Sequence, residues 1–388
     1  MNFLETCNIS ITTLSPIHIG CGEDYEPTNY VVDGNRLYTF DPVLLLRELP
    51  QKNQEEFARI VEGENSLRTI QSFFYRNKHA ATKIGIINAD VVQPIQTFYD
   101  SRIGQVAQRE QGGKNVLNKL EIARTAFNPI NGKPILPGSS VKGAVRTAVL
   151  ESLRQRQGFK KSREMETDIL QGSFSTDPFR LLKISDGRFL PKIKLKQHDG
   201  SHKEVERLPR VCLQVNRKKH PNRYGAGGNV NTLLECIPVN TPHAFTAKLV
   251  VEHKTGDGRQ TPVLQLDFAT VARACNHFYL ERFHAENGFL KENKYAVKWA
   301  SDMEKALGPG GLLKNALDEG KGFLLRVGRH SGAESVTVNA PRSIKIMKGR
   351  GKSPEYAEEA TTLWLAADSK DQVENLQPFG WVFVRRIS

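Results

Sequence analysis

The most informative stretch of the sequence reads Lys133-Pro134-Ile135-Leu136-Pro137-Gly138-Ser139-Ser140-Val141-Lys142-Gly143-Ala144-Val145-Arg146. After Ser140, apolar residues recur at the spacing of one helix face, at Val141, Ala144, Val145, Ala148, Val149 and Leu153. The pattern predicts a helix that begins near Ser139, with Ser139 or Ser140 as its N-cap. Gly138, which has no side chain, would let another backbone segment approach closely.

The start of this helix is a candidate phosphate site. Lys142 and Arg146 are four residues apart on its polar face, where positive charge is unfavourable to the helix dipole. A phosphate at the helix start would accept hydrogen bonds from the free backbone amides and would pair with the two cations. The candidate contacts are Gly138, Ser139, Ser140, Lys142, Gly143 and Arg146. The alternative is an ordinary capped helix whose Lys142 and Arg146 side chains are solvated.

Two glycine-rich loops are further candidates. One is residues 18–22, with His18, Gly20 and Gly22, and the other is residues 326–332, with Arg326, Gly328, Arg329 and Gly332. Glycines permit close backbone approach, and neighbouring arginines suit a sugar–phosphate chain. The alternative is a pair of tight turns with exposed arginines.

The rest of the chain alternates strand and helix patterns without a regular βαβ repeat, which favours an α+β fold. Strands are expected over residues 8–14, 30–32, 37–40, 244–251, 323–328, 335–338, 361–365 and 381–384, and helices over 43–49, 54–62, 66–77 and about 264–282. A break near residue 235 would divide the chain into domains at 1–235 and 236–388.

The chain is basic, with 55 Lys and Arg against 42 Asp and Glu over 388 residues, a net charge of +13. Such a charge suggests a polyanionic partner, although a merely soluble basic protein fits equally well. Many of the cations, including Arg217, Lys218 and Lys219, fall in residues 154–223, which is interpreted as a basic insertion. The 39% of hydrophobic residues argue against wholesale disorder.

Several other sites receive little support from the residues. Ser139 to Lys142 fits S-x-x-K, Ser185-Asp186-Gly187 loosely fits S-D-N and Lys254-Thr255-Gly256 is K-T-G, the order of motifs in β-lactam-binding serine hydrolases. Each tripeptide is common by chance, and the second differs at its third position. Gly138 to Gly143 has P-loop glycine spacing, but Ala144 stands where the lysine should follow. His18 acting as a base in RNA cleavage is a second alternative, without an identifiable partner acid.

No cofactor or metal is expected. The five cysteines are scattered and form no C-x-x-C pair, as in a cytosolic protein with reduced thiols. The sequence shows no apolar run of about 20 residues and no secretory leader, so a cytoplasmic location without a membrane is expected.

Taken together, these segments resemble the RAMP superfamily of CRISPR–Cas proteins. The resemblance rests on residues 15–22 after a strand and on residues 134–146. Within the superfamily, the pieces Thr361-Thr362-Leu363-Trp364-Leu365 and Pro378-Phe379-Gly380-Trp381 are similar to Csm-type subunits that cap the crRNA 3′ end in type III-A effector complexes.

The resemblance implies two ferredoxin-like, RRM-like domains and a non-catalytic role in holding the crRNA 3′ region and supporting its maturation. It implies as partners crRNA, the repeating backbone subunit and the small subunit, with target RNA and a host nuclease for trimming as further candidates. In the backbone subunit an aspartate after the first strand cuts RNA. The matching position here falls near Thr28-Asn29, which lack a carboxylate, although Asp24 and Asp33 are nearby.

Overall fold

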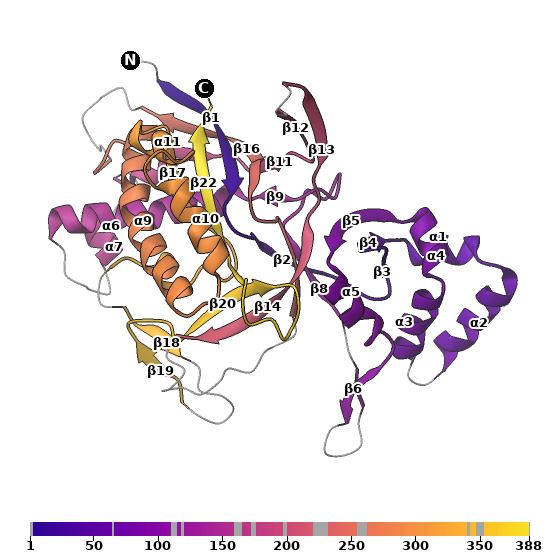
Figure 1. Cartoon of the computed structure of the whole chain (residues 1–388). Coiled ribbons are helices and arrows are strands. Elements are labelled where there is room, and N and C mark those ends of the chain that lie inside the picture. The colour runs from indigo at the N-terminus through magenta and orange to yellow at the C-terminus, as the bar shows by residue number, and fades with distance from the viewer. Residues whose placement is uncertain are drawn as a thin grey trace.

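The structure of the chain is a computed structural model. It describes residues 3–63, 66–109, 115–117, 120–158, 165–171, 176–196, 200–219, 232–253, 262–339, 342–346 and 353–387. Helices and sheets are mixed without a regular βαβ repeat (Figure 1), so the α+β prediction is confirmed.

The first sheet joins the beginning of the chain to its end. Counted over the described residues, it has seven strands: β17 (Gly322–Arg326), β22 (Trp381–Arg386), β1 (Leu4–Thr13), β16 (Thr241–Glu252), β11 (Gly187–Phe189) and β9 (Ile135–Leu136) in that order, with β10 (Leu182–Ile184) also paired to β16. β1 runs antiparallel to both β16 and β22. Its alternate residues Cys7, Ile9 and Ile11 are fully buried, which is the period-two pattern of a strand with one face in a core.

Two long helices pack together against this sheet. They are α6 (Gly138–Gln157) and α9 (Phe268–Glu292), and the Tyr279 hydroxyl donates to the Ala144 carbonyl oxygen at 3.1 Å between them. Shorter helices follow nearby: α7 (Met165–Ile169), α10 (Val297–Leu307) and α11 (Lys314–Asp318). The helix predicted from residue 139 is confirmed, as is the helix predicted from about residue 264, which begins at Phe268.

The second sheet runs β2 (Gly20–Tyr25), β8 (Ile122–Thr125), β15 (Thr232–Cys236), β14 (Arg210–Lys218), β5 (Ile86–Val91), β4 (Arg36–Thr39) and β3 (Tyr30–Asp33). β20 (Thr362–Ala367) pairs with both β14 and β21 (Gln377–Pro378). The predicted hairpin of residues 30–40 is β3 and β4.

A helical lobe stands at the β3–β5 end of this sheet, away from α9 (Figure 1). It contains α1 (Pro42–Glu48), α2 (Gln51–Glu62), α3 (Ser66–Arg76), α4 (Lys78–Ile84) and α5 (Gln93–Asp100). Asp41 caps α1 as its sequence suggests, because its carboxylate accepts from the Val43 amide at 2.8 Å. Phe40 and Phe74, 5.2 Å apart, belong to a core cluster of this lobe.

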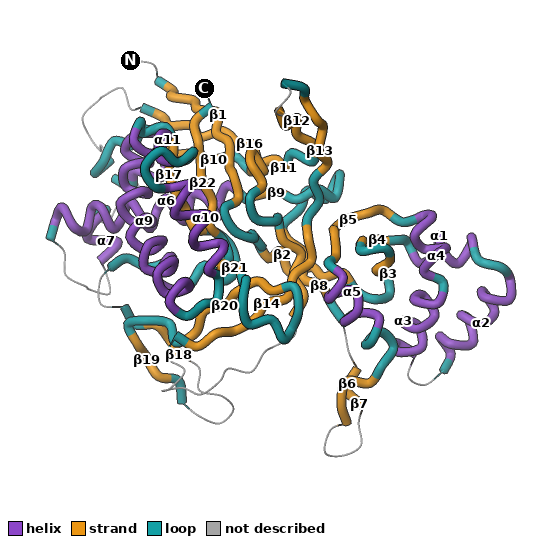
Figure 2. The backbone as a smooth tube through the Cα atoms, in the orientation of Figure 1, coloured by secondary structure: helices purple, strands orange, loops and turns teal. Residues whose placement is uncertain are grey.

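Short hairpins project from the two sheets (Figure 2). They are β6 (Val106–Arg109) with β7 (Asn115–Leu117), β12 (Lys192–Lys196) with β13 (His202–Glu206), and β18 (Ile344–Ile346) with β19 (Glu355–Ala357). Two 3-10 turns, Pro178–Arg180 and Ala333–Ser335, complete the elements of the described residues. The second lies where a strand over 335–338 was expected, so that strand prediction is wrong.

The tract expected to be a basic insertion, residues 154–223, contributes to both sheets. The described parts of this tract supply β10 and β11 to the first sheet and β14 to the second. Only β12 and β13 project from the sheets as a hairpin. In β14 the residues from Val211 to Val215 are all buried, because β14 has neighbours on both edges and is covered on both faces. The cations at either end of the strand concealed this apolar run in the sequence.

Strand pairing also crosses the expected break near residue 235. β1 lies between two strands from the second half of the chain, and β14 pairs with β20. Each sheet therefore contains strands from both 1–235 and 236–388. Separately, none of the helices in the described ranges is long and apolar enough to span a membrane.

Candidate nucleic-acid interface

The structure brings the two predicted glycine loops into direct contact. Gly328 has φ +83°, and a Cβ atom on it would lie 2.5 Å from the His18 carbonyl oxygen. The next residue, Arg329, donates its backbone N–H to the same oxygen at 2.8 Å. Only glycine fits this combination of a left-handed backbone and a close approach. We call residues 18–22 and 326–332 together the loop junction.

The loop junction is fixed to the second sheet through His330. The His330 ring stacks on Trp364, with 5.2 Å between ring centroids, and its Nε2 lies 2.5 Å from Oε1 of Gln214 on β14. Burial, followed by nearby positive charges, lowers the pKa of His330 to about 3. This histidine is therefore a neutral packing residue that links both sheets.

The His18 side chain lies under the exposed surface of the junction and is fully buried. Its Nδ1 is 2.8 Å from the Glu235 carbonyl oxygen, which assigns the proton to Nδ1 and leaves Nε2 as an acceptor. Nε2 is buried without a hydrogen-bond partner in the described part of the chain, and burial is the main cause that lowers the pKa of His18. A base for RNA cleavage must reach the 2′-hydroxyl, so this position disfavours the alternative in which His18 cuts RNA.

Glu235 is a buried carboxyl on β15 that supports the same loop. It accepts from the Tyr25 hydroxyl at 2.9 Å and from the Thr125 amide at 3.0 Å. Burial raises its pKa from an ordinary value of 4.5 to about 7, although both hydrogen bonds oppose the rise. Its proton is therefore held in the folded protein over a pH range in which the unfolded chain would lose it.

This shift predicts a stability that falls as pH rises towards and through 7. Between the two pKa values the folded state binds more protons, so the contribution of Glu235 falls by about 1.4 kcal/mol per pH unit. Thermal unfolding of the wild type and of Glu235→Gln at about pH 5.5 and about pH 8.5 measures the effect. We expect the midpoint of the wild type to fall more than that of the variant. Equal falls in the two proteins would contradict the raised pKa.

Several groups at the junction are exposed. Gly20, Cys21, Gly22 and the Arg329 side chain all reach the surface. Arg124, which the sequence analysis missed, stands beside them on β8, with its guanidinium 3.5 Å from the ring centre of Phe127 and 4.6 Å from that of Tyr25. The short alternating run Ile122–Thr125 was the available signal, and no strand was expected there.

Other predicted cations have partners within the protein. Arg326 is buried and pairs with Glu286 at 2.8 Å, and Lys219 pairs with Glu334 at 2.8 Å. Arg217 donates to the Gln372 carbonyl oxygen at 2.5 Å. Lys218 is half-buried at the end of β14, and Gly332, with φ +78°, immediately precedes the 3-10 turn. The free positive charge expected at Arg217, Lys219 and Arg326 is thus largely internal.

The start of α6 differs from its prediction. The helix begins at Gly138 after Pro137, and neither Ser139 nor Ser140 caps it. The Gly138 amide instead donates to Oδ1 of Asp186 at 2.8 Å, so the anion at this amide is a carboxylate of the protein. The close approach at Gly138 is confirmed, because a Cβ atom there would lie 2.1 Å from the Ile184 carbonyl oxygen.

The cations of α6 are also partly engaged. Arg146 pairs with Glu166 and, at 3.0 Å, with Asp177. Lys142 is half-buried, and burial is the main cause that lowers its pKa. Gly143 is exposed one residue later. Of the two predicted phosphate ligands, Lys142 keeps a side chain without an ion pair among the described residues.

Backbone hydrogen bonds link α6 to the loop junction. The Ala126 amide donates to the Ile19 carbonyl oxygen at 2.6 Å, and the Ile135 amide donates to the Ala126 carbonyl oxygen at 2.8 Å. Ile135 begins β9, which leads directly into α6. The backbone at Ala126 therefore lies between the first glycine loop and the strand that leads into α6, and it is hydrogen-bonded to both.

The serine-hydrolase alternative gains nothing from the structure. Within the described residues, no hydrogen bond joins Ser139 to Lys142, although a serine nucleophile needs a base within reach. The segment Lys254-Thr255-Gly256 lies outside the described residues. The described ranges also contain no cluster of three or more His, Cys, Asp or Glu side chains placed to hold a metal ion.

Relatives of known name cover part of this chain. Proteins described as CRISPR system Cms protein Csm5 from Mycobacterium tuberculosis (strain CDC 1551 / Oshkosh) and from Streptococcus thermophilus are 29% and 28% identical over 161 and 156 residues. Each match covers 39% of this chain and 40% of the relative, so the chain spans about two-fifths of the length of these relatives.

Solved structures resemble the chain over almost its whole length. A chain in the cryo-EM structure of a Csm-crRNA-target RNA ternary complex of a type III-A CRISPR-Cas system has a TM-score of 0.58 and 14% identity, covering 98% of this chain and all of that one. The crystal structure of T. onnurineus Csm5 gives 0.54 and 15%, covering 97% and 99%. At these identities the likeness shows a shared fold.

The sequence profile of the RAMP superfamily matches residues 10–307, which include the first glycine loop, α6 and most of both sheets. The chain therefore belongs to the RAMP superfamily.

Proposed function

We propose that the chain is a non-catalytic RNA-binding subunit of a type III CRISPR effector complex, in which it caps the backbone filament and holds the crRNA 3′ region. The observation that carries the proposal is the loop junction, where Gly328 packs on the His18 backbone and Arg329 stands exposed beside Gly20 and Gly22. The names of the relatives and the RAMP membership support the same function.

The chemistry of the junction suits a sugar–phosphate backbone. Exposed glycines leave room for a close strand, and the exposed Arg329 supplies positive charge beside them. Contacts of this kind position RNA without reading its bases, as a guide of variable sequence requires. The proposed partners are crRNA, the repeating backbone subunit and the small subunit, with target RNA and a trimming host nuclease also in contact, in the cytoplasm and without a cofactor.

The absence of catalysis in this proposal has local support. Thr28-Asn29 lie in the turn between β2 and β3, and the nearby Asp33 pairs with Lys78 at 2.9 Å. Asp24 is exposed on β2, but the buried imidazole of His18 offers it no accessible partner base.

The element order β1, α6, β10, β16, α9, β22 is that of a ferredoxin-like unit, and we propose this unit as the first of two.

The test is RNA retention by the effector complex assembled with Arg329→Ala. Loss of one phosphate contact should weaken binding to all guide sequences to a similar extent and reduce the salt-dependence slope by about 0.7. Filter binding over a salt series measures both. Arg59→Ala, on an exposed turn of α2, is the control that should leave retention and slope unchanged.

A variant complex that keeps its RNA with the wild-type slope would contradict the assignment of Arg329. Incubation of the purified chain with repeat RNA in EDTA tests the endoribonuclease alternative. Cleavage products that disappear in His18→Ala would show that the chain is an endoribonuclease and would contradict the non-catalytic role.

A further inference from the structure

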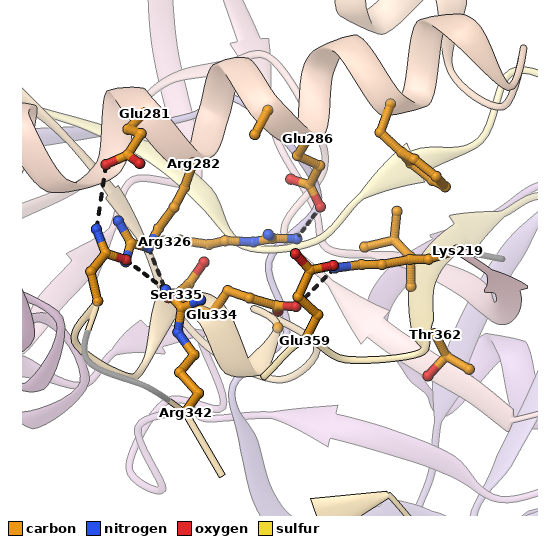
Figure 3. Close-up of a pocket in the computed structure, with 15 residues that line it drawn as sticks. Lys219, Glu281, Arg282, Glu286, Arg326, Glu334, Ser335, Arg342, Glu359 and Thr362 are labelled. Carbon is orange, nitrogen blue, oxygen red and sulfur yellow. Dashed lines mark hydrogen bonds and ion pairs between the residues drawn. The ribbon is translucent and has the colours of Figure 1, made fainter. Parts of the chain in front are cut away.

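A pocket beside the loop junction lies between α9, residues 332–339 with Arg342, and the start of β20 (Figure 3). Its volume is about 390 Å³, within the range of sites for small ligands. Ala285, Phe289 and Leu363 form an apolar wall, and charged side chains line the remainder.

Two ion pairs line this pocket, and the two charges within each pair neutralise each other. Lys219 binds Glu334 at 2.8 Å, and the Arg326 side chain reaches across the pocket to Glu286 at 2.8 Å (Figure 3). The Glu334 carboxylate also accepts from the Ala360 amide at 2.9 Å. These groups are satisfied within the protein and leave the remaining charges to determine what the pocket binds.

Two guanidiniums in the pocket share one neutral acceptor. Arg282 and Arg342 each donate to Oδ1 of Asn339 at 2.6 Å, and within the described residues neither has a carboxylate within 4.0 Å. Arg282 also donates to the carbonyl oxygens of Glu334 and Phe278, at 2.8 and 2.7 Å, so its charge is met by neutral acceptors. The Nε atom of Arg342 is buried and has no hydrogen-bond partner there. Burial and then the charge of Arg342 lower the pKa of Arg282 to about 10. An anion between the two guanidiniums would relieve this repulsion and supply the missing acceptor.

Two carboxylates on the rim are available as acceptors. Glu359 is exposed and has no ion pair among the described residues. Glu281 accepts one long hydrogen bond, of 3.5 Å, from the side-chain Nδ2 of Asn339. A ligand that fills the pocket should therefore carry hydroxyl or amino donors as well as an anion. A ribonucleoside phosphate has all of these groups and a flat base that suits the apolar wall.

We infer that this pocket binds a ribonucleoside phosphate, with the phosphate between Arg282 and Arg342, the donors facing Glu281 and Glu359, and the base against Phe289 and Leu363. The ligand is either a free mononucleotide or the terminal nucleotide of an RNA strand. This binding is independent of the RNA contact proposed for Arg329.

Equilibrium dialysis of the full chain against AMP, adenosine and inorganic phosphate tests the inference. We expect AMP to bind one site, and adenosine to bind at least tenfold more weakly because it lacks the anion. Arg342→Gln should weaken AMP binding at least tenfold. Arg342→Lys keeps the charge but loses the planar guanidinium with its paired N–H donors, so its affinity for AMP should lie between those of Arg342→Gln and the wild type. Arg59→Gln, an exposed arginine of α2, is the matched control.

A trinucleotide RNA with and without a terminal phosphate distinguishes the source of the ligand. Binding of the phosphorylated trinucleotide but not of AMP, lost in Arg342→Gln, would assign the pocket to an RNA end. The inference is overturned if AMP and adenosine bind equally, if Arg342→Gln binds AMP as the wild type does, or if neither phosphorylated probe binds. Loss of AMP binding in a variant complex that retains its crRNA leaves the proposed function intact.

Discussion

Replacement of Gly328 by alanine is expected to separate the two glycine loops and to destabilise the protein. The new Cβ would lie 2.5 Å from the His18 carbonyl oxygen and 2.8 Å from Cδ1 of Ile19, closer than real side chains come. The positive φ of Gly328 adds backbone strain of about 1–3 kcal/mol. Relief of the overlap requires a backbone shift, which costs about a further 1–3 kcal/mol.

Gly310→Ala is the matched control for this variant. Gly310 also has a positive φ, +74°, but a Cβ atom there meets nothing within 4 Å. Both variants therefore include backbone strain, and only Gly328→Ala includes the overlap. Denaturant unfolding should show a clearly larger loss of unfolding free energy for Gly328→Ala, together with weaker RNA retention. Equal losses would mean that contact with His18 does not hold the loops together.

The second large effect is expected for Arg326→Leu. Arg326 and Glu286 form a buried ion pair, with side chains 5% and 10% exposed, and the Trp381 indole N–H donates to the other carboxylate oxygen at 2.6 Å. Removal of the guanidinium leaves a buried carboxylate with one neutral donor. Loss of one member of a buried pair costs about 3–5 kcal/mol.

Two further variants separate charge from packing. Arg59→Leu removes an exposed arginine of α2 and should change the unfolding free energy by less than about 0.5 kcal/mol. The double variant Arg326→Leu/Glu286→Leu also removes the unpaired carboxylate, so it should recover part of the stability lost in Arg326→Leu. A single variant as stable as Arg59→Leu would show that the pair is not a structural element.

Local patterns predicted the elements well where one face of an element meets one core. The alternation in β1, the helical spacing after Ser140 and the Asp41 cap are all read from neighbouring residues. The close approach at Gly138 followed from the absence of a side chain. No local pattern revealed β14, because a strand buried on both faces has no alternation to detect.

Charges were predicted less well because their partners are distant in sequence. Asp186 supplies the anion for the start of α6, and Glu286 and Glu334 neutralise Arg326 and Lys219. None of these partners can be paired with its cation from spacing alone. The net charge of +13 therefore overstates the positive surface at the candidate sites. The meeting of the two glycine loops likewise depends on the packing of strands from opposite ends of the chain.

The central position of β1 has a consequence for synthesis of the protein. Ile11 pairs with Phe245 on one side and with Val384 on the other. A nascent chain therefore carries β1 with an open edge until β22 has left the ribosome, and long-range pairing of this kind forms slowly. Open strand edges invite pairing with other chains. Yield from cells should thus depend on how well this early strand is shielded while the ribosome completes β22.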